Sequence, residues 1–452
     1  MEKNYVLDTN ILLDSPNAIY GFDDNTVVIT TTTLQELDSK KSLHNDIGFN
    51  ARETCRILDE LRKRGSLSAG VRLGNMGALK IVHINTQELP TGYDYSKPDN
   101  QIIGTTLSLQ KFDESHHTKT VLVTNDISMR VNAATCGIKH VESYKNERIS
   151  SDTDIYTGRR VVEVTDYEAM EKLAKEKIID SKYFADSKNP FVENEFLTLK
   201  CGKQSLLAIY QNGTVKVIDT KKTHSFGITP KNAAQNFALY ALLAPVEEIP
   251  FIILRGGPGT AKTFLSLLGG LDKVYDSKSN RTYDKILISR NNVTADADFG
   301  YLPGDLDEKM NPLMAPFYDN LQSIIRAKNK DMSSEDVKMQ IEDMFYTGLI
   351  EVCPLAYMRG RSITNSYLIV DETQNASRSQ IRDIITRAGE GTKVIICGDP
   401  NQVDNPTLDR WNNGLVFAAD KMKGSKLCAQ VTFSNSESVR SLLAKEGAEK
   451  LK

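Results

Sequence analysis

A glycine-rich turn between an apolar run and a helical pattern constrains this chain more than any other feature. The run FIILRG leads directly into GGPGTAKT, and a leucine-rich stretch follows. Glycines at such a turn let backbone N–H groups face phosphate oxygens at the start of a helix. The stretch therefore predicts a strand, a phosphate-binding loop and a helix, within an α/β part of the chain. The predicted loop comprises Gly256, Gly257, Pro258, Gly259, Thr260, Ala261, Lys262 and Thr263.

Two residues of this loop carry its expected chemistry. Lys262 would reach the β- and γ-phosphates of ATP, and Thr263 would offer its hydroxyl to Mg²⁺. Ala261 departs from the usual GxxxxGK[ST] pattern, which has a glycine at that position. A positive φ at Ala261 would cost roughly 1–2 kcal/mol, whereas an ordinary φ would cost little. The departure therefore bears on nucleotide affinity more than on the identity of the site.

Two later strand patterns end in polar residues that suit the same site. YLIVDET closes on Asp371, which would hold the water shell of Mg²⁺, and on Glu372, which would polarise the attacking water. KVIICGDPNQVD closes on Asp399, expected to fix the turn, and on Gln402, which could sense the γ-phosphate. Each pattern alone could be a solvated strand end. Three such signals in this order favour a nucleoside-triphosphate hydrolase.

A glutamine upstream of the loop has two interpretations. Gln235 stands about 27 residues before Lys262, within a helical pattern. Its place resembles that of the adenine-reading glutamine of helicases, and a side-chain amide can match a donor and an acceptor on a base edge. A glutamine on a helix surface is an equally good interpretation.

The last half of the chain, 228–452, closely resembles the PhoH-type ATPases. The motifs that carry the resemblance are LPGD, PLAYMRGR, DETQN and GDPNQVD. These ATPases are similar to the first RecA-like domain of superfamily 1 helicases. The resemblance implies that Arg290, Arg359 and Arg361 lie near phosphates or nucleic acid, and that Arg440 is the family's late arginine. A surface ion pair is the alternative for each of them.

The short stretch after the last motif leads to an expectation about assembly. About 48 residues follow QVD, too few for a second RecA-like domain. The closing face of the ATP site, and an arginine finger, would then come from another subunit. We expect a homo-oligomer, a ring of six by the resemblance, in which Arg440 acts in trans.

A second group of acidic residues lies near the other end of the chain. Strand and helix patterns alternate there, which predicts a parallel sheet whose strand ends share one crevice. Carboxylates gathered in such a crevice need a divalent ion, and oxygen ligands suit Mg²⁺ or Mn²⁺. Thr9 and Thr124 would orient ligands or cap turns. The four acidic positions, for which scattered surface acids are the alternative, are Asp8, Glu36, Asp99 and Asp126.

The same segment, 1–145, resembles the PIN domain, a metal-dependent ribonuclease fold. VLDTNILL, LQELD, DNQII and VTNDISMR match its four acidic positions in order. Together the two halves resemble the PIN–PhoH fusion family, which is linked to unwinding and cleavage of RNA. The resemblance implies an ATP-dependent RNA helicase coupled to a ribonuclease that cuts single strands. DNA stays open as the polymer.

Two other functions fit the same motifs. One is a toxin-like endoribonuclease whose ATPase regulates access. The other is an ATP-switched RNA-binding or assembly protein with little cleavage, which slow turnover caused by Ala261 would favour.

The middle of the chain differs from both ends. The polar stretch 146–160 predicts a linker, and 161–227 predicts a small β-rich module of OB-like or SH3-like type, with a hairpin turn at QNGT. A net charge of −3 argues against a basic surface over the whole molecule. Six separate cysteines without a CxxC pair, and no apolar run of membrane-spanning length, lead us to expect a cytoplasmic protein that does not enter a membrane.

Overall fold

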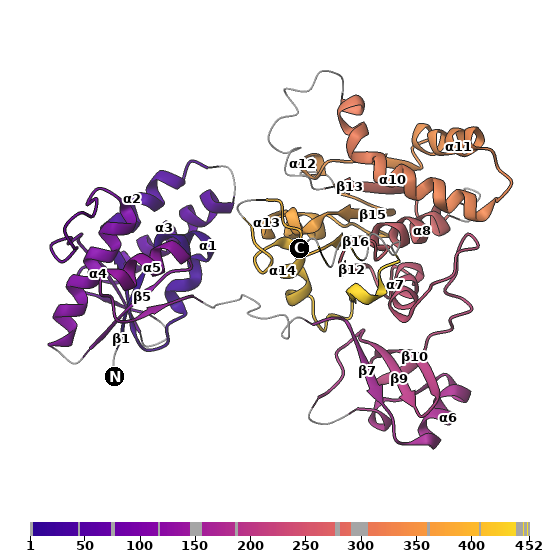
Figure 1. The fold of residues 1–452 in the computed structure, drawn as a ribbon, viewed down its shortest axis with the longest axis horizontal. Helices are drawn as coiled ribbons and strands as arrows, with labels where there is room; N and C mark the ends of the chain where they lie inside the picture. The colour runs from indigo at the N-terminus through magenta and orange to yellow at the C-terminus, as the bar shows by residue number, and fades with distance from the viewer. Residues whose placement is uncertain are drawn as a thin grey trace. The chain divides into compact units, whose positions relative to one another are not determined.

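The computed structural model forms two compact units, residues 1–148 and 149–452. Figure 1 labels many of their helices and strands and colours the chain from the N-terminus to the C-terminus. Among the described residues, no helix is long and apolar enough to cross a membrane. The structure describes residues 3–43, 46–73, 77–115, 118–144, 156–185, 189–275, 281–290, 306–358, 362–405 and 408–439, together with 446 and 450.

The first unit has a six-stranded sheet in the order β3-β4-β2-β1-β5-β6. Its neighbouring strands run parallel except for the pair β3 and β4. Runs such as TVVIT and KTVLV are almost wholly buried, as expected for parallel strands covered on both faces. The strands are β1 (Lys3–Leu7), β2 (Thr26–Thr30), β3 (Val71–Arg72), β4 (Ala78–Val82), β5 (Lys119–Val123) and β6 (Val141–Glu142).

Helices cover both faces of this sheet. One buried cluster includes side chains of α1 and α3, and the other includes side chains of α4 and α5. The first residues of several helices therefore meet the carboxyl ends of the strands, where the acidic residues are. The helical elements are α1 (Thr9–Asp14), η1 (Pro16–Tyr20), α2 (Thr31–Lys40), α3 (Asp46–Arg64), α4 (Pro98–Glu114) and α5 (Ile127–Thr135).

The second unit begins with a small five-stranded sheet in the order β7-β9-β10-β11-β8. The predicted QNGT hairpin is confirmed: Gln211 pairs with Thr214, and Asn212 and Gly213 both have positive φ. β7 starts within the stretch that the sequence assigns to a linker. The elements are β7 (Arg159–Glu163), α6 (Tyr167–Glu176), β8 (Ile178–Asp180), η3 (Ser181–Tyr183), β9 (Phe196–Cys201), β10 (Gln204–Gln211) and β11 (Thr214–Val217).

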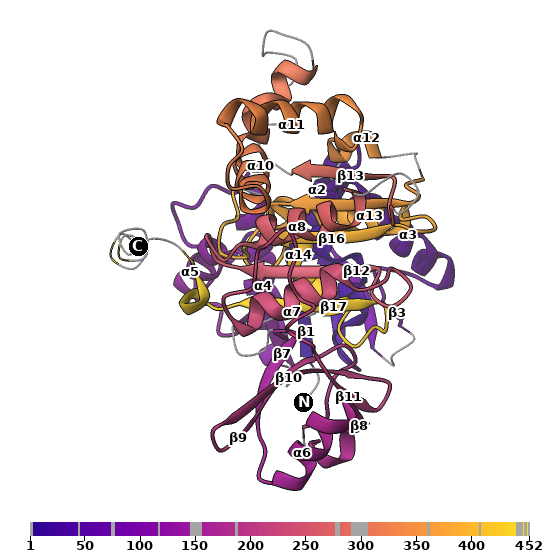
Figure 2. The same cartoon turned by 90° about the vertical axis from the view of Figure 1, so that its right-hand side faces the viewer.

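A second sheet of six parallel strands, in the order β14-β13-β15-β16-β12-β17, forms the centre of this unit. Strands β12, β15 and β16 are buried at every residue. Figure 2 shows the small sheet beyond the edge strand β17, which β7 contacts. The strands are β12 (Phe251–Gly256), β13 (Lys285–Arg290), β14 (Ile350–Val352), β15 (Ser366–Asp371), β16 (Lys393–Gly398) and β17 (Cys428–Phe433).

Helices cover the large sheet on two sides, which confirms the predicted α/β class. One buried cluster takes in α7, α8, α10 and α11, and the other takes in α12, α13 and α14. The helical elements are α7 (Ala233–Leu243), α8 (Lys262–Val274), α10 (Leu306–Lys328), α11 (Ser334–Tyr346), α12 (Leu355–Met358), η4 (Thr373–Asn375), α13 (Arg378–Thr386), α14 (Gly414–Lys421) and η5 (Asn435–Glu437).

Candidate active sites

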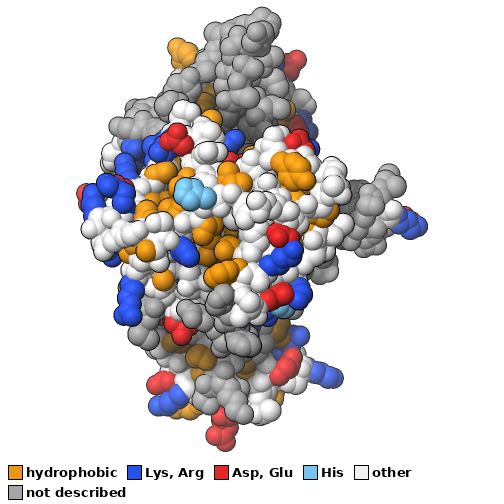
Figure 3. All heavy atoms as spheres, turned by 90° about the vertical axis from the view of Figure 1, so that its left-hand side faces the viewer, with side chains coloured by type: hydrophobic (Ala, Val, Ile, Leu, Met, Phe, Trp, Pro, Cys, Tyr) orange, Lys and Arg blue, Asp and Glu red, His pale blue; other side chains and the backbone are white. Residues whose placement is uncertain are grey.

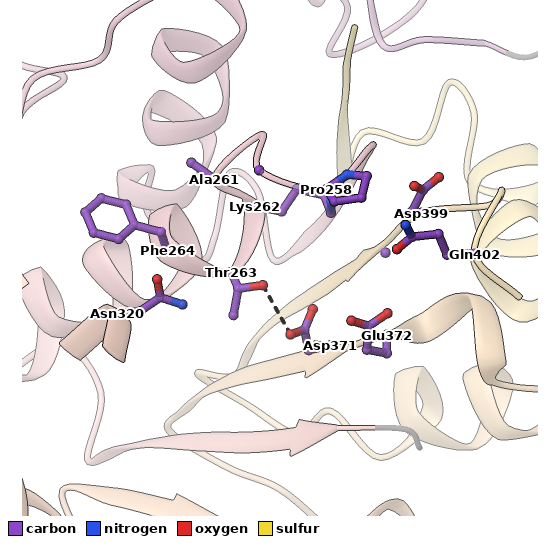
Figure 4. A pocket seen from close by; sticks show the side chains of 12 residues that line it. Pro258, Ala261, Lys262, Thr263, Phe264, Asn320, Asp371, Glu372, Asp399 and Gln402 are labelled. Carbon is purple, nitrogen blue, oxygen red and sulfur yellow. Dashed lines mark hydrogen bonds between the residues drawn. The ribbon is translucent and has the colours of Figure 1, made fainter. Parts of the chain in front are cut away.

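A pocket of about 270 Å³ opens where β12, β15 and β16 end. Ligands of open α/β sheets bind at this carboxyl edge, beside loops that lead into helices. Figure 4 shows Thr263, at the end of the glycine-rich loop, facing the two acidic side chains at the end of β15. The lining residues are Pro258, Gly259, Ala261, Lys262, Thr263, Phe264, Asn320, Asp371, Glu372, Gly398, Asp399 and Gln402.

The glycine-rich loop needs unusual backbone angles at three positions. Gly256 has φ 153° and Gly259 has φ 74°. A Cβ on Gly256 would lie 2.8 Å from the Cβ of Phe433, so the neighbouring strand also requires glycine there. Ala261, which caps α8, has φ 69° and ψ 23°. The structure therefore gives Ala261 the left-handed conformation, which costs an L-residue about 1–2 kcal/mol.

The lysine and threonine that follow both line the pocket, and Figure 4 shows Thr263 directed at Asp371. Lys262 Nζ donates to the carbonyl oxygens of Gly256, at 2.6 Å, and Gly257, at 3.1 Å. Thr263 Oγ1 donates to Asp371 Oδ2 at 3.1 Å, which joins the helix start to the end of β15. An ammonium group, a hydroxyl and a carboxylate thus meet within one pocket, the set that a magnesium–triphosphate needs.

The two carboxylates at the end of β15 have different environments. Asp371 is buried, which raises its pKa; Glu372 adds to the rise, while Arg290 and Lys262 oppose it. Glu372 is partly exposed and has φ 52°, a strained conformation for a non-glycine residue. Its Oε1 lies 3.4 Å from Arg290 Nη2. Asp371 is thus suited to hold a cation, and Glu372 to face the reacting water.

Gln374 is a residue of this site that the sequence analysis did not single out. Its side chain is fully buried, and its Nε2 donates to Glu372 Oε2 at 2.6 Å and to the carbonyl of Gln402 at 2.9 Å. Its Oε1 accepts from the amide of Asp399 at 3.1 Å. One amide therefore joins the end of β15 to the end of β16. The quoted motif DETQN contains it, but nothing in the motif says what it touches.

In the first unit, Asp8 stands between β1 and α1 and is 1% exposed. Burial raises its pKa to about 6, and the charges of Asp99 and Glu36 add to the rise. The hydroxyl of Thr124, at the end of β5, opposes it by donating to Asp8 Oδ2 at 2.7 Å. The predicted convergence of strand ends therefore brings Asp8 within the electrostatic reach of two other predicted acids.

The remaining acids come from three helices around the same sheet edge. Glu36 lies on α2, and its Oε2 accepts from Thr9 Oγ1 at 2.5 Å. Asp99 is in the first turn of α4; burial raises its pKa, and the charge of Asp126 adds to the rise. Asp126 caps α5, its Oδ1 accepting from the amide of Met129 at 3.0 Å.

The four acidic side chains of the first unit can be compared with the requirements of a divalent cation. Four oxygen-donor side chains influence one another electrostatically, and the most buried of them has a raised pKa, which a cation would lower. Among the described residues, however, no three acidic, histidine or cysteine side chains already stand close enough to form a metal cluster. The chemistry of the donors fits Mg²⁺ or Mn²⁺, and their side chains would have to draw together around it.

The chain matches two family descriptions. Residues 5–145 match "PIN domain" and residues 227–451 match "PhoH-like protein". A protein named PhoH2 from Bacillus subtilis (strain 168) is 36% identical over 462 aligned positions, which cover all of both chains. The chain belongs to the PhoH2 family.

Other relatives support this membership. Proteins named PhoH2 from Thermobispora bispora and Mycolicibacterium smegmatis are each 30% identical and cover 96% of this chain and 94% of their own. The resemblance to PIN and PhoH proteins drawn from the sequence is confirmed. This PhoH2 family member thus joins a nuclease-like PIN domain to a PhoH-like ATPase domain.

Four predicted positions of the PhoH-like part lie away from the pocket or outside the described residues. Gln235 is buried on α7, and its Oε1 accepts from the amide of Lys231 at 2.8 Å. It is absent from the pocket lining among the described residues. Arg359, Arg361 and Arg440 lie outside the part of the chain that the structure describes.

Proposed function

We propose that this protein is an ATP-dependent RNA helicase coupled to a metal-dependent ribonuclease. ATP would be hydrolysed in the pocket of the second unit, and single-stranded RNA would be cut at the four-carboxylate group of the first. The observation that carries the proposal is the meeting of Lys262, Thr263, Asp371 and Glu372 in one pocket. The helicase and RNA parts rest on the resemblance to PIN–PhoH proteins.

The residues of the pocket divide the hydrolysis between them. Bound Mg²⁺ would neutralise phosphate charge, with Thr263 and Asp371 as the residues that hold it. Lys262 would release its bonds to the loop carbonyls and donate to phosphate oxygens. Glu372 would accept the proton of the attacking water, held in place by Gln374. Gln402 would donate to the γ-phosphate.

The four-carboxylate group supplies the cutting site of the proposal. A bound Mg²⁺ or Mn²⁺ ion would make water a nucleophile at neutral pH. Asp8, Glu36, Asp99 and Asp126 would hold the ion, with Thr124 and Thr9 orienting two of the carboxylates. The face in Figure 3 mixes acidic and basic side chains around a hydrophobic area, and the described residues drawn there form no continuous basic patch.

Assembly and compartment complete the proposal. We expect a homo-oligomer, a ring of six, in which Arg440 of one subunit reaches the ATP pocket of the next. Gln235 would read adenine once its bond to the Lys231 amide is released. We assign the protein to the cytoplasm because its six cysteines are free thiols, which suits a reducing compartment.

The decisive experiment incubates the full chain with matched RNA and DNA strands, with and without ATP, Mg²⁺ and Mn²⁺. We expect metal-dependent RNA cleavage that Asp8→Asn abolishes, and ATP hydrolysis that Lys262→Ala abolishes. Full ATPase activity in Lys262→Ala would refute the assignment of the ATP site. Equal cleavage by Asp8→Asn would refute the cutting site.

The left-handed conformation of Ala261 favours a second candidate, an ATP-switched RNA-binding protein that turns over slowly. A strand-displacement assay distinguishes the helicase from the ATP-switched binding protein. A helicase needs hydrolysable ATP, whereas a switch responds equally to a non-hydrolysable analogue.

A further inference from the structure

A short segment at the start of the second unit runs along the edge of the ATPase sheet. The amide of Thr432, on the edge strand β17, donates to the carbonyl of Thr157 at 2.9 Å. A Cβ on Gly158 would lie 1.8 Å from the carbonyl oxygen of Gln430, so the two backbones touch. Arg159 then enters β7, whose partner in the small sheet is β9. The segment 156–159 therefore connects the edge of the large sheet to the small sheet.

Arg159 makes the strongest contact of this segment. Its Nη1 and Nη2 donate to Glu437 Oε1 and Oε2 at 2.8 and 2.5 Å, and its Nε donates to the carbonyl of Thr432 at 2.8 Å. Glu437 also accepts from the amide and the hydroxyl of Ser434, at 2.8 and 2.9 Å. The side chains of Arg159 and Glu437 are only 21% and 17% exposed. Such a two-point, mostly buried ion pair fixes direction as well as distance.

This ion pair connects directly to the phosphate-binding loop. Two residues after Glu437, the amide of Val439 donates to the carbonyl of Gly259, inside the loop, at 3.0 Å. At the other end of the loop, the buried Arg255 donates to the carbonyl of Tyr156. The segment 156–159 is thus tied to the residue before the loop and, through Glu437, to the middle of the loop.

We infer that Arg159 and Glu437 are positioning residues for the ATP site: their ion pair holds the 434–439 stretch so that it supports the phosphate-binding loop. The inference rests on the proposed ATPase function. A loop whose N–H groups bind phosphate must keep its shape, because each misdirected donor loses a charge-assisted bond. Ala261 has φ 69°, a strained conformation for a residue with a side chain, so the end of this loop needs support from outside it.

The test measures ATP binding to the full chain by calorimetry in the presence of Mg²⁺, with the KM and kcat of hydrolysis. We expect Arg159→Ala and Glu437→Gln each to weaken ATP binding about tenfold, equivalent to about one charge-assisted hydrogen bond. KM should rise more than kcat falls. Arg159→Lys should be intermediate, and Arg159→Glu combined with Glu437→Arg should recover part of the affinity.

The neighbouring residue provides a matched control. Arg160 makes a similar two-point ion pair with Glu195 within the small sheet, at 2.7 and 2.8 Å. Arg160→Ala should lower the unfolding temperature without changing ATP affinity. ATP binding unchanged in Arg159→Ala, or weakened equally by Arg160→Ala, would overturn the inference. Lys262→Ala is measured in parallel: if it binds ATP normally, the proposed ATP site itself is wrong.

Discussion

At the scale of the residue, Ala261 shows how one methyl group can matter. Its left-handed backbone destabilises the folded state by about 1–2 kcal/mol. A glycine would remove that cost, but it would also stabilise the unfolded chain by about 0.4–1 kcal/mol, because glycine has more conformational entropy there. We therefore expect Ala261→Gly to raise the free energy of unfolding by about 0.5–1 kcal/mol. ATP affinity should rise with it, which thermal unfolding and ATP titration would measure.

A second alanine gives this prediction a control of opposite sign. Ala174 lies exposed on α6, so Ala174→Gly should destabilise the protein by up to about 1 kcal/mol. If Ala261→Gly lowers the free energy of unfolding as much as Ala174→Gly does, the left-handed conformation of Ala261 does not destabilise the protein.

Asp8 gives a prediction about pH at the same scale. Its pKa in the folded unit, about 6, is above the ordinary value of 3.8, so the folded form binds a proton more tightly than the unfolded form. Without metal, the stability of the first unit should therefore fall by about 2 kcal/mol as pH rises from 4 to 7. Urea unfolding in a chelator would measure this fall.

Asp8→Asn should remove that fall, because an amide does not titrate in this range. Asp24→Asn, at an exposed acid of the same unit, should leave it unchanged. The same pH dependence in Asp8→Asn and the parent chain would contradict the assignment to Asp8.

At the scale of the element, the ATP site depends on two strand ends being held together. Gln374 is the side chain that bonds both, and Gln374→Leu would leave the Asp399 amide and the Gln402 carbonyl without it. We expect a loss of stability of about 1–3 kcal/mol. The kcat for ATP should fall at least about tenfold, since Glu372 loses its fixed position, with a smaller change in ATP affinity.

A substitution of another glutamine serves as a control that should change stability without changing catalysis. Gln380 completes the capping box at the start of α13, so Gln380→Ala should cost about 0.5–2 kcal/mol of stability with kcat unchanged. Normal kcat in Gln374→Leu would exclude the positioning role.

At the scale of the whole molecule, two compact units with separate hydrophobic cores should respond to different ligands. In calorimetry with constant Mg²⁺, a non-hydrolysable ATP analogue should raise the unfolding temperature of the second unit only. Mn²⁺, added without nucleotide, should raise the unfolding temperature of the first unit. A ligand at 100 times its Kd adds about 2.7 kcal/mol of stability to the unit that binds it.

Two variants assign these transitions. Lys262→Ala should lose the shift caused by the ATP analogue, and Asp8→Asn should lose the shift caused by Mn²⁺. Loss of both shifts in either variant would mean that the units unfold as one.

Local signals made much of the architecture predictable. The glycine-rich loop, the strand ending in Asp371 and Glu372 and the QNGT hairpin are each specified by residues within a few positions of one another. Parallel strands then bring their carboxyl ends to one edge, which is why the acids around Asp8 could be grouped from sequence alone.

Only the tertiary structure decided the backbone angle of Ala261, the bonds of Gln374 and the pairing of Arg159 with Glu437. Arg159 stands at the end of a stretch that composition marks as a linker, and its partner is 278 residues away. Periodicity and turn chemistry report what neighbouring residues do, whereas a hydrogen bond between distant segments depends on how whole sheets pack. The sequence therefore predicts which chemical groups the site contains, and the packing determines what holds them in place.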